Sequence, residues 1–278
     1  MSPTLINFKK ELTHLYDERE IQALYFGMMN RILHRDKTYL LVHQQDLEMD
    51  EEEMRIYENS VSRLKKSEPV QYIFNDSEFF GLHFYVDSNV LIPRPETEEL
   101  IEWILQENQI SNILDIGTGS GCIAISLKKN RPDANVHALD ISEEAIRIAQ
   151  RNASTNQVDV RFRIDDILRP AENHATFDVI VSNPPYITEK EKHTMHKNVL
   201  DYEPHLALFV SDEDPLLYYR KISEFAHNHL CENGKLFFET NEKFAVETAN
   251  MLKENGFDEV IVKKDINGKN RMIRCRKK

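Results

Sequence analysis

The sequence predicts an α/β protein in which a small helical domain precedes a larger domain built on a parallel sheet. From residue 110 onward, apolar runs typical of strands alternate with amphipathic helical runs, and this alternation favours a parallel sheet. Residues 1 to 68 contain glycine only at Gly27, and their apolar residues recur at helical spacing. Between Ile113 and Leu127 a strand, a glycine loop and a helix follow one another, as at the start of a nucleotide-binding sheet.

The N-terminal part predicts a helical bundle followed by a short β segment. Gln71–Phe74 and Phe79–Val86 flank the turn residues Asn75, Asp76 and Ser77, which favours a β-hairpin. We therefore expect a helical domain over 1–70, a β-hairpin linker over 71–92 and a larger domain over 93–278. The expected helices before the larger sheet are Pro3–Tyr16, Asp17–Leu33, Glu51–Lys66 and Pro95–Asn108, the last begun by a proline in its first turn.

The larger domain predicts a seven-stranded sheet of the Rossmann-like kind. Its last two runs, Glu259–Val262 and Arg271–Cys275, surround the hairpin signal Asn267-Gly268, so the final pair should be antiparallel. The five strands before them are expected near residues 112–116, 135–139, 159–164, 177–182 and 235–240. The helices that alternate with these strands are expected near 121–130, 142–154, 214–231 and 242–255.

The amino-acid composition limits the kinds of molecule that this protein is expected to bind. The 278 residues are 41% hydrophobic, enough for one large and one small core. Acidic residues number 47 and basic residues 35, and the net charge of −12 opposes binding to a nucleic-acid backbone. The N-terminus has no apolar signal region and no segment has the length of a membrane span. Three cysteines without metal or redox spacing suit a reducing cytoplasm, and we expect no bound metal.

The run Asn183-Pro184-Pro185-Tyr186 is the strongest indication of a site. It follows the apolar run Phe177–Ser182 and so lies where a buried strand ends. The prolines lack N–H donors and stiffen the turn, and each residue before a proline is driven to extended geometry. Asn183 adds a side-chain carbonyl and Tyr186 an aromatic face. Such a turn could bind a planar group with N–H donors, either an amide or an exocyclic amine.

The glycine loop predicts a site for an adenosine cofactor. The expected second strand ends at Asp140, whose carboxylate could accept both ribose hydroxyls. The loop reads Gly-x-Gly-x-Gly, with its third glycine one residue earlier than in the dinucleotide fingerprint. No histidine or Tyr-Lys pair is placed for hydride transfer, which favours S-adenosyl-L-methionine over NAD. Asp115 either holds the ammonium of that cofactor or caps the loop.

The next strand end completes the expected cofactor pocket. Asp165 and Asp166 follow the third strand, where an oxygen could meet the adenine amine and Ile167 the adenine face; a solvated strand end is the other reading. The predicted cofactor-binding residues are Asp115, Gly117, Thr118, Gly119, Ser120, Gly121, Asp140, Ile141, Asp166, Ile167 and Asn183.

Several polar residues outside these motifs keep two readings. Arg94, stiffened by Pro93 and Pro95, lines the mouth of the site or forms a surface ion pair. Glu203 supports the Asn183 turn, binds substrate or forms a salt bridge. His193, His196 and His205 are expected at the surface or in packing, and Cys122 in packing.

Taken together, these stretches resemble the HemK-type protein-(glutamine-N5) methyltransferases, which act on peptide chain release factors. The resemblance covers nearly the whole chain, with one departure at Thr240-Asn241, where the family often has a glycine. It is carried by the stretches Glu68–Ile73, Phe79–Leu82, Leu91–Glu98, Leu114–Gly121, Asn183–Tyr186 and Tyr202–Leu208.

The resemblance implies a reaction and its site residues. It implies methyl transfer from S-adenosyl-L-methionine to the glutamine of a Gly-Gly-Gln loop, S-adenosyl-L-homocysteine as product, and a helical domain that helps hold the release factor. The seven-stranded sheet is that of a class I methyltransferase fold, and we expect a monomer in the cytoplasm. The catalytic residues are then expected to be Asn183, Pro184 and Tyr186, and the substrate-binding residues Arg94, Asn183, Pro184, Pro185, Tyr186 and Glu203.

Three other functions remain to be weighed. A ribosomal-protein glutamine methyltransferase would share Asn183–Tyr186, but Pro93–Glu98 fits the release-factor enzymes better. A nucleic-acid adenine-N6 methyltransferase would also share the turn, and the net charge of −12 opposes it. A cofactor-binding scaffold without catalysis is disfavoured because Asp140, Asn183 and the glycine loop are all present.

Overall fold

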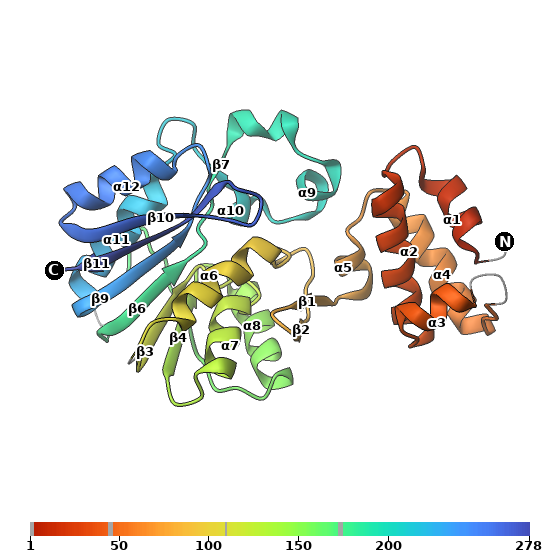
Figure 1. Ribbon diagram of the computed structural model, residues 1–278, viewed down its shortest axis with the longest axis horizontal. Coiled ribbons are helices and arrows are strands. Elements are labelled where there is room, and N and C mark those ends of the chain that lie inside the picture. The colour runs from red at the N-terminus through yellow and green to blue at the C-terminus, as the bar shows by residue number, and fades with distance from the viewer. Residues whose placement is uncertain (1–2, 44–46, 109, 172–174) are drawn as a thin grey trace. The chain divides into compact units, whose positions relative to one another are not determined.

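The computed structural model describes residues 3–43, 47–108, 110–171 and 175–278. These residues form two compact units. The first comprises residues 3–75 together with 196–202, and the second residues 76–195 together with 203–278 (Figure 1).

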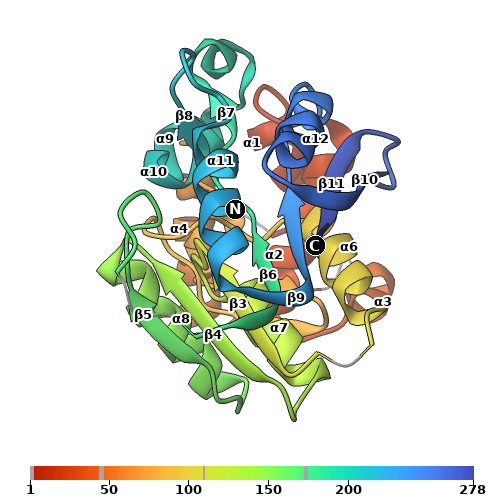
Figure 2. The same cartoon turned by 90° about the vertical axis from the view of Figure 1, so that its left-hand side faces the viewer.

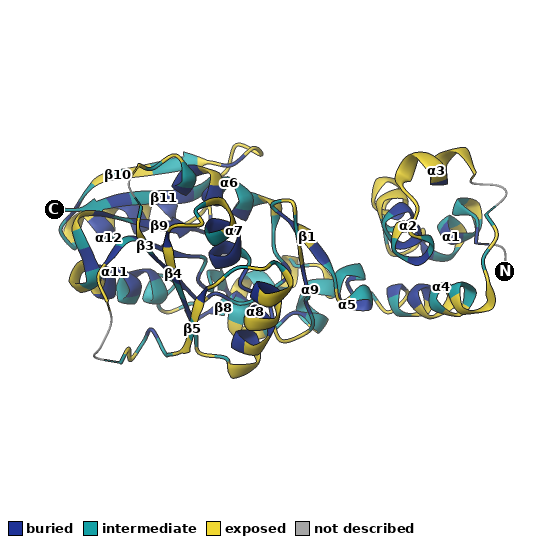
Figure 3. Ribbon diagram, turned by 90° about the horizontal axis from the view of Figure 1, so that it is seen from below, coloured by how far each residue is buried: buried dark blue, intermediate teal, exposed yellow. Residues whose placement is uncertain are grey.

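The first unit is helical. Phe8, Tyr25 and Met28 are fully buried at its centre, and the Tyr25 hydroxyl donates to the carbonyl of Pro3 at 2.8 Å. Short α3 buries only Leu40, and Figure 3 shows it almost wholly exposed. The helices of this unit are α1 (Leu5–Leu12), α2 (Glu18–Leu33), α3 (Lys37–Val42), α4 (Glu51–Leu64), α5 (Val70–Phe74) and α9 (Lys197–Tyr202).

The expected hairpin strand at Gln71–Phe74 is wrong, because these residues belong to helix α5. Arg63 donates to the carbonyl of Ile73 at 3.1 Å, which satisfies a group that the helix end leaves open. Asn75 ends the helix in the left-handed region (φ 51°) and is not a hairpin turn. The turn is formed instead by Phe80 and Gly81, both with positive φ, as two-residue hairpins require.

The second unit is built on a seven-stranded sheet, counted within the described residues, and this confirms the predicted fold class. The strand order is β10-β11-β9-β6-β3-β4-β5 (Figure 2). Strand β11 is antiparallel to its neighbours β10 and β9, and the strands from β9 to β5 pair in parallel. The strands of this sheet are β3 (Asn112–Ile116), β4 (Asn135–Asp140), β5 (Arg161–Ile164), β6 (Phe177–Ser182), β9 (Leu230–Glu239), β10 (Phe257–Lys264) and β11 (Asn270–Lys277).

The remaining elements of this unit cover the sheet or extend from its edge. Tyr219, Ile222 and Phe225 of α11 pack on Leu114 and Ile180 of the sheet in one buried cluster. These elements are β1 (Ser77–Phe79), β2 (Leu82–Phe84), α6 (Pro95–Leu105), α7 (Cys122–Asn130), α8 (Glu143–Thr155), β7 (Ile187–Thr188), the 3₁₀ helix η1 (Glu189–Thr194), α10 (His205–Leu208), β8 (Phe209–Val210), α11 (Leu217–His229) and α12 (Ala245–Glu254).

The topology fixes where a ligand can bind. After β3 the chain moves to β4 and β5 on one side, while β6 returns on the other side of β3. In an open α/β sheet the crevice at such a reversal, outside the carboxyl ends of the strands, is the usual ligand site. Among the described residues, no helix is both long and apolar enough to cross a membrane.

Candidate functional site

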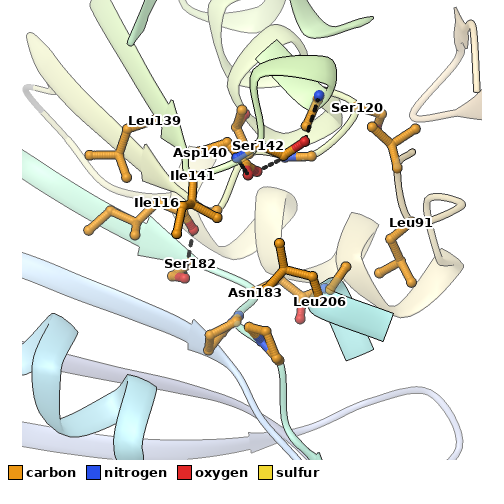
Figure 4. A pocket seen from close by; sticks show the side chains of 18 of the residues that line it. Leu91, Ile116, Ser120, Leu139, Asp140, Ile141, Ser142, Ser182, Asn183 and Leu206 are labelled. Atoms are coloured by element: carbon orange, nitrogen blue, oxygen red, sulfur yellow. Dashed lines mark hydrogen bonds between the residues drawn. The ribbon is translucent and has the colours of Figure 1, made fainter. Parts of the chain in front are cut away.

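A cavity of about 280 Å³ lies at the carboxyl ends of β3, β4 and β6. The glycine loop and the strand ends form one side of the cavity. The opposite side includes Leu91 and Arg94, which precede α6, and Thr97, which lies in α6. Leu206 of α10 faces the same space, and Figure 4 shows it beside Asn183.

Gly117, Gly119 and Gly121 of the loop have positive φ values of 73°, 53° and 82°. Glycine is required at these positions for two different physical reasons. A Cβ on Gly117 or Gly119 would meet no atom within 4 Å, so these glycines are required by backbone conformation. A Cβ on Gly121 would lie 2.9 Å from Ile125 and 3.1 Å from Ala149, so this glycine also allows α7 to pack against α8.

Asp115 lies beneath the loop and does not line the cavity. It is fully buried, and its Oδ2 accepts the hydroxyl of Thr118 at 2.7 Å. Its Oδ1 has no hydrogen-bond partner among the described residues. This geometry supports the reading in which Asp115 caps the loop. Burial raises the pKa of its carboxyl to about 7, against opposing hydrogen bonds from Thr118 and the Ala124 backbone.

The raised pKa predicts how stability depends on pH. Folded Asp115 binds its proton more tightly than the unfolded chain, whose ordinary value is 3.8, so its contribution is favourable at low pH and is lost as pH rises toward 7. Over that range the loss from this group is at most about 4 kcal/mol. We expect Asp115→Asn to melt higher than the unchanged protein at pH 8 and to melt equally near pH 4, in scanning calorimetry without cofactor. The same difference in melting temperature between the two proteins at both pH values would contradict this prediction.

Asp140 lies at the end of β4 and lines the cavity (Figure 4). Its Oδ2 accepts the backbone N–H of Gly119 at 2.8 Å, and its Oδ1 accepts that of Ser142 at 2.9 Å. Burial raises the pKa of this carboxyl, and the Ser142 and Gly119 backbone N–H groups oppose that shift. The Ile141 backbone N–H also interacts with this carboxylate, which has about four lone-pair sites in all. Asp140 therefore holds the loop and keeps acceptor capacity for a ligand hydroxyl.

Apolar and acidic groups continue the wall beyond Asp140. The side chain of Ile141 is half exposed in the cavity, and Ile167 lines it from the end of β5. Asp166 accepts the backbone N–H of Leu168 at 2.9 Å through Oδ1, which orders the turn. Asp165 also lines this wall. The structure thus brings together every predicted cofactor residue except Asp115 and Gly121, which lie outside the cavity lining.

The Asn-Pro-Pro-Tyr turn begins where β6 ends. Ser182 is fully buried and donates its hydroxyl to the carbonyl of Ile116 at 2.7 Å, which ties the end of β6 to that of β3. Asn183, Pro184 and Pro185 line the cavity.

Tyr186 takes a different place from the one predicted, because it does not line the cavity. Its ring packs against the buried cluster between the sheet and α11, and its hydroxyl donates to Glu239 at 3.2 Å. Burial raises the pKa of this phenol well above its ordinary value, with the Glu239 charge acting in the same direction. Its contacts are those of an anchor for the turn.

Sequence reasoning missed two polar residues beside this turn, Thr97 and Glu239. Glu239 ends β9 and is 1% exposed, and Thr97 in the first turn of α6 is 2% exposed. The Thr97 hydroxyl donates to Glu239 at 2.6 Å, and Asn183 Nδ2 lies 3.5 Å from the Thr97 hydroxyl. The sequence did contain one signal for Glu239, which was not used: a carboxylate directly after the apolar run Leu236–Phe238 indicates a buried acid at a strand end.

Glu203 does not line the cavity but holds the segment that does. Its carboxylate pairs with Arg94 and accepts the backbone N–H of Ile92 at 3.2 Å. Its side chain is 1% exposed, whereas that of Arg94 is 32% exposed. The ion-pair reading is therefore supported for both residues, and Arg94 also lines the cavity wall.

This pair gives a stability prediction. Arg94→Ala should lower the free energy of unfolding by about 3 kcal/mol, because a buried carboxylate loses its counter-ion. The double variant Arg94→Ala with Glu203→Gln should recover part of the loss, since no charge then remains buried. Urea unfolding of the three proteins measures both values. Equal stability of the single and double variants would show that the buried charge is not the cause.

The histidines and the cysteine considered as candidates take no part in the proposed reaction. His193, His196 and His205 do not line the cavity, and the His205 ring packs edge-on to Phe209 with centroids 5.1 Å apart. Cys122 borders the cavity, but burial raises the pKa of its thiol to about 12, so it stays protonated and unreactive.

Comparison with known proteins identifies the class of this fold. A family model described as the methyltransferase small domain matches residues 96–205, and one described as the PrmC N-terminal domain matches residues 6–74. A methyltransferase from Pyrococcus furiosus is similar in structure with a TM-score of 0.53 at 20% identity, covering 79% of this chain and 98% of its own. A T. thermophilus 16S rRNA N2 G1207 methyltransferase in complex with AdoMet and guanosine has a TM-score of 0.51 at 16% identity, covering 73% of this chain and 50% of its own. The chain is an S-adenosylmethionine-dependent methyltransferase with the class I fold.

Relatives that match along the whole chain identify the family. A release factor glutamine methyltransferase of Flavobacterium psychrophilum is 49% identical, covering 96% of this chain and 95% of its own. One of Bacteroides thetaiotaomicron is 46% identical, covering 95% and 96%. The chain belongs to the release factor glutamine methyltransferase family.

Proposed function

We propose that this protein transfers a methyl group from S-adenosyl-L-methionine to the side-chain amide nitrogen of the glutamine in the Gly-Gly-Gln motif of peptide chain release factors. The observation that carries the proposal is the position of Asn183 and Pro184 at the cavity that Asp140 and the glycine loop also line. One site thus combines acceptors for an amide with acceptors for a ribose. Membership of the family supports the same substrate.

The residues present suit the cofactor. The backbone at Gly117 and Gly119 carries no side chain and borders open space, so an extended ligand can lie against it. Asp140 keeps acceptor capacity for the ribose hydroxyls, and Ile141 and Ile167 offer apolar surface to the adenine. Asp166 is assigned to the adenine amine. When bound, S-adenosylmethionine supplies a methyl group already activated as a sulfonium.

The protein's main task is then to place the amide. An amide nitrogen is a weak nucleophile because its lone pair is delocalised into the carbonyl. In our mechanism Asn183 Oδ1 and the Pro184 carbonyl accept the two N–H bonds of the glutamine amide and turn its nitrogen toward the methyl carbon. Such orientation can lower a barrier by roughly 7–11 kcal/mol in favourable cases. Methyl transfer would form a nitrogen–carbon bond and break the sulfur–carbon bond, with S-adenosyl-L-homocysteine as leaving group, and one amide proton would then pass to solvent. Because the N–H bonds become more acidic as the nitrogen gains the methyl group, Asn183 and Pro184 would bind them more strongly in the transition state.

The other parts of the chain take supporting roles in this proposal. Tyr186 fixes the turn from behind, and Arg94 faces the substrate from the cavity wall. We assign residues 1–70 to recognition of the release factor, 71–92 to the linker and 93–278 to methyl transfer; the separate family match at 6–74 supports the first of these. The protein is proposed to act as a monomer in the cytoplasm, where its substrate works, without binding nucleic acid directly.

The test compares three substrates. Purified protein is incubated with methyl-labelled cofactor and, separately, with release factor, ribosomal protein and adenine-containing DNA, and the label is located by mass spectrometry. We expect label on the Gly-Gly-Gln glutamine alone, and a much lower initial rate of labelling when Asn183→Ala replaces the unchanged protein. Label on ribosomal-protein glutamine or on adenine alone would overturn the assignment of substrate.

A further inference from the structure

The amide of Asn183 lies at one end of a chain of polar contacts that leads away from the cavity. Its Nδ2 is 3.5 Å from the hydroxyl of Thr97, which donates to Glu239 Oε2 at 2.6 Å. Tyr186 donates to the other oxygen, Glu239 Oε1, at 3.2 Å. The four groups come from the start of α6, the turn after β6 and the end of β9, so only the folded unit brings them together.

The contact between Thr97 and Glu239 determines which group donates and which accepts in this series of polar contacts. A distance of 2.6 Å between hydroxyl and carboxyl oxygens is typical of a hydroxyl that donates to a charged carboxylate. An ionised carboxylate only accepts, so the single proton of Thr97 points to Glu239. The lone pairs of the Thr97 oxygen then face Asn183. They attract the amino end of that side-chain amide and repel its carbonyl end.

Two hydroxyl groups and one cation near Glu239 stabilise its ionised form and oppose the effect of burial, which on balance raises the pKa of this carboxyl. Arg271 of β11 lies near enough to stabilise the carboxylate and also donates to the Thr240 carbonyl at 3.2 Å, while Glu96 of α6 opposes it. Burial is the largest influence and raises the pKa of Glu239, and the Thr97 and Tyr186 hydroxyls and Arg271 act against it. The Tyr219 hydroxyl, from α11, donates to the Glu239 backbone carbonyl at 3.4 Å.

We propose that Thr97, oriented by Glu239, is a positioning residue that fixes the side-chain amide of Asn183 with its oxygen toward the substrate. This inference rests on the role proposed for Asn183 above. An amide whose oxygen faces the cavity accepts an N–H of the substrate glutamine. The same amide turned by 180° would present its own N–H groups to those of the substrate, and two donors repel. Thr97 thus acts on the substrate through the amide of Asn183.

The first test separates positioning from structure with Thr97→Val, which keeps the shape of the side chain and removes the hydroxyl. We expect kcat for release factor methylation to fall about tenfold or more, because small misplacement of a reacting group has effects of that order. The KM for release factor and the dissociation constant of S-adenosyl-L-homocysteine should change less than threefold. Thr97→Ser keeps the hydroxyl and should restore kcat to within about threefold of the unchanged protein.

A double-variant cycle identifies the residue through which Thr97 acts. In an Asn183→Ala background, Thr97→Val should cause no further loss of kcat, because the amide that it orients is gone. The same loss in both backgrounds would overturn the proposal. A normal kcat for Asn183→Ala would instead refute the role of Asn183, and a normal kcat for Thr97→Val with an impaired Asn183→Ala would refute the inference alone.

A second measurement uses the unmodified sequence and does not depend on the folding of any Thr97 variant. In ¹⁵N-edited NMR of the full chain, the side-chain NH₂ signals of Asn183 are identified by their absence from Asn183→Ala. We expect a nuclear Overhauser effect between these protons and the Thr97 methyl group. NH₂ protons that instead contact cavity residues such as Leu206, and not Thr97, would show the opposite orientation and overturn the proposal.

Discussion

Replacing Asn183 by alanine is expected to lower kcat for release factor methylation by about 10²- to 10³-fold, the size of effect seen when one preorganised transition-state hydrogen bond is removed. The side-chain oxygen binds the substrate amide most strongly as its nitrogen gains positive charge, so the loss should appear in kcat. The affinity for S-adenosyl-L-homocysteine should change less than threefold. Steady-state kinetics with purified release factor and calorimetry with the product cofactor measure the two effects separately.

The matched control for this variant is Asn228→Ala. Asn228 is exposed on α11, and its amide donates to the carbonyl of Glu224 one turn earlier. It should retain normal kinetics and thus show that loss of an asparagine side chain alone is harmless. If Asn183→Ala kept near-normal turnover, the turn after β6 would not be the group that orients the amide.

Asp140→Ala is expected to raise the dissociation constant of S-adenosyl-L-homocysteine about 100-fold. Two hydrogen bonds from the ribose to a charged acceptor are lost, each worth roughly 1.5–3 kcal/mol, and part of this is replaced by water. The backbone N–H groups of Gly119 and Ser142 also lose their acceptor, so the loop is less well ordered before binding. Isothermal titration calorimetry measures the change, and kcat at saturating cofactor should fall much less than the affinity.

Asp133→Ala is the control at the opposite end of the same strand. Asp133 is exposed just before β4 begins, away from the carboxyl ends that form the cavity. Its removal changes the net charge by the same amount but should leave the dissociation constant within about twofold. An equal effect of the two variants would mean that long-range charge, and not ribose contact, explains the loss at Asp140.

The parallel strands could be predicted from sequence because buried strands are continuous apolar runs. The bounds of β3 and β6 agree with the expected 112–116 and 177–182. The predictions of short elements failed for a related reason, because the five residues of α5, Val70–Phe74, are too few to reveal a helical or a strand period. The contact with Arg63 that completes α5 is a tertiary one, which local propensity does not contain.

The segment between β6 and α11 shows the same limit. It contains β7, η1, α9, α10 and β8, none of which was expected, and residues 196–202 cluster with the helical unit and not with their sequence neighbours. Each of these elements is six residues long or shorter. Elements of this length are stabilised by their neighbours and not by their own propensity.

Some residues of the site could be predicted from the sequence and others could not. Asp140 and Asn183 could be found because each follows a recognisable strand, and the topology then brings those strand ends together. Thr97 and Glu239 are 142 residues apart, and neither belongs to a motif that predicts the other. Asp115 and Tyr186 lie beside the site but do not line the cavity, because sequence places a side chain at a strand end but does not say toward which side it turns.

The most direct test of the central claim is a crystal structure of the protein with S-adenosyl-L-homocysteine and a Gly-Gly-Gln peptide. We expect the glutamine amide nitrogen within about 3 Å of both Asn183 Oδ1 and the Pro184 carbonyl oxygen, and facing the cofactor sulfur. A glutamine held by other groups, or a cofactor whose sulfur lies away from the turn at Asn183–Tyr186, would contradict the mechanism.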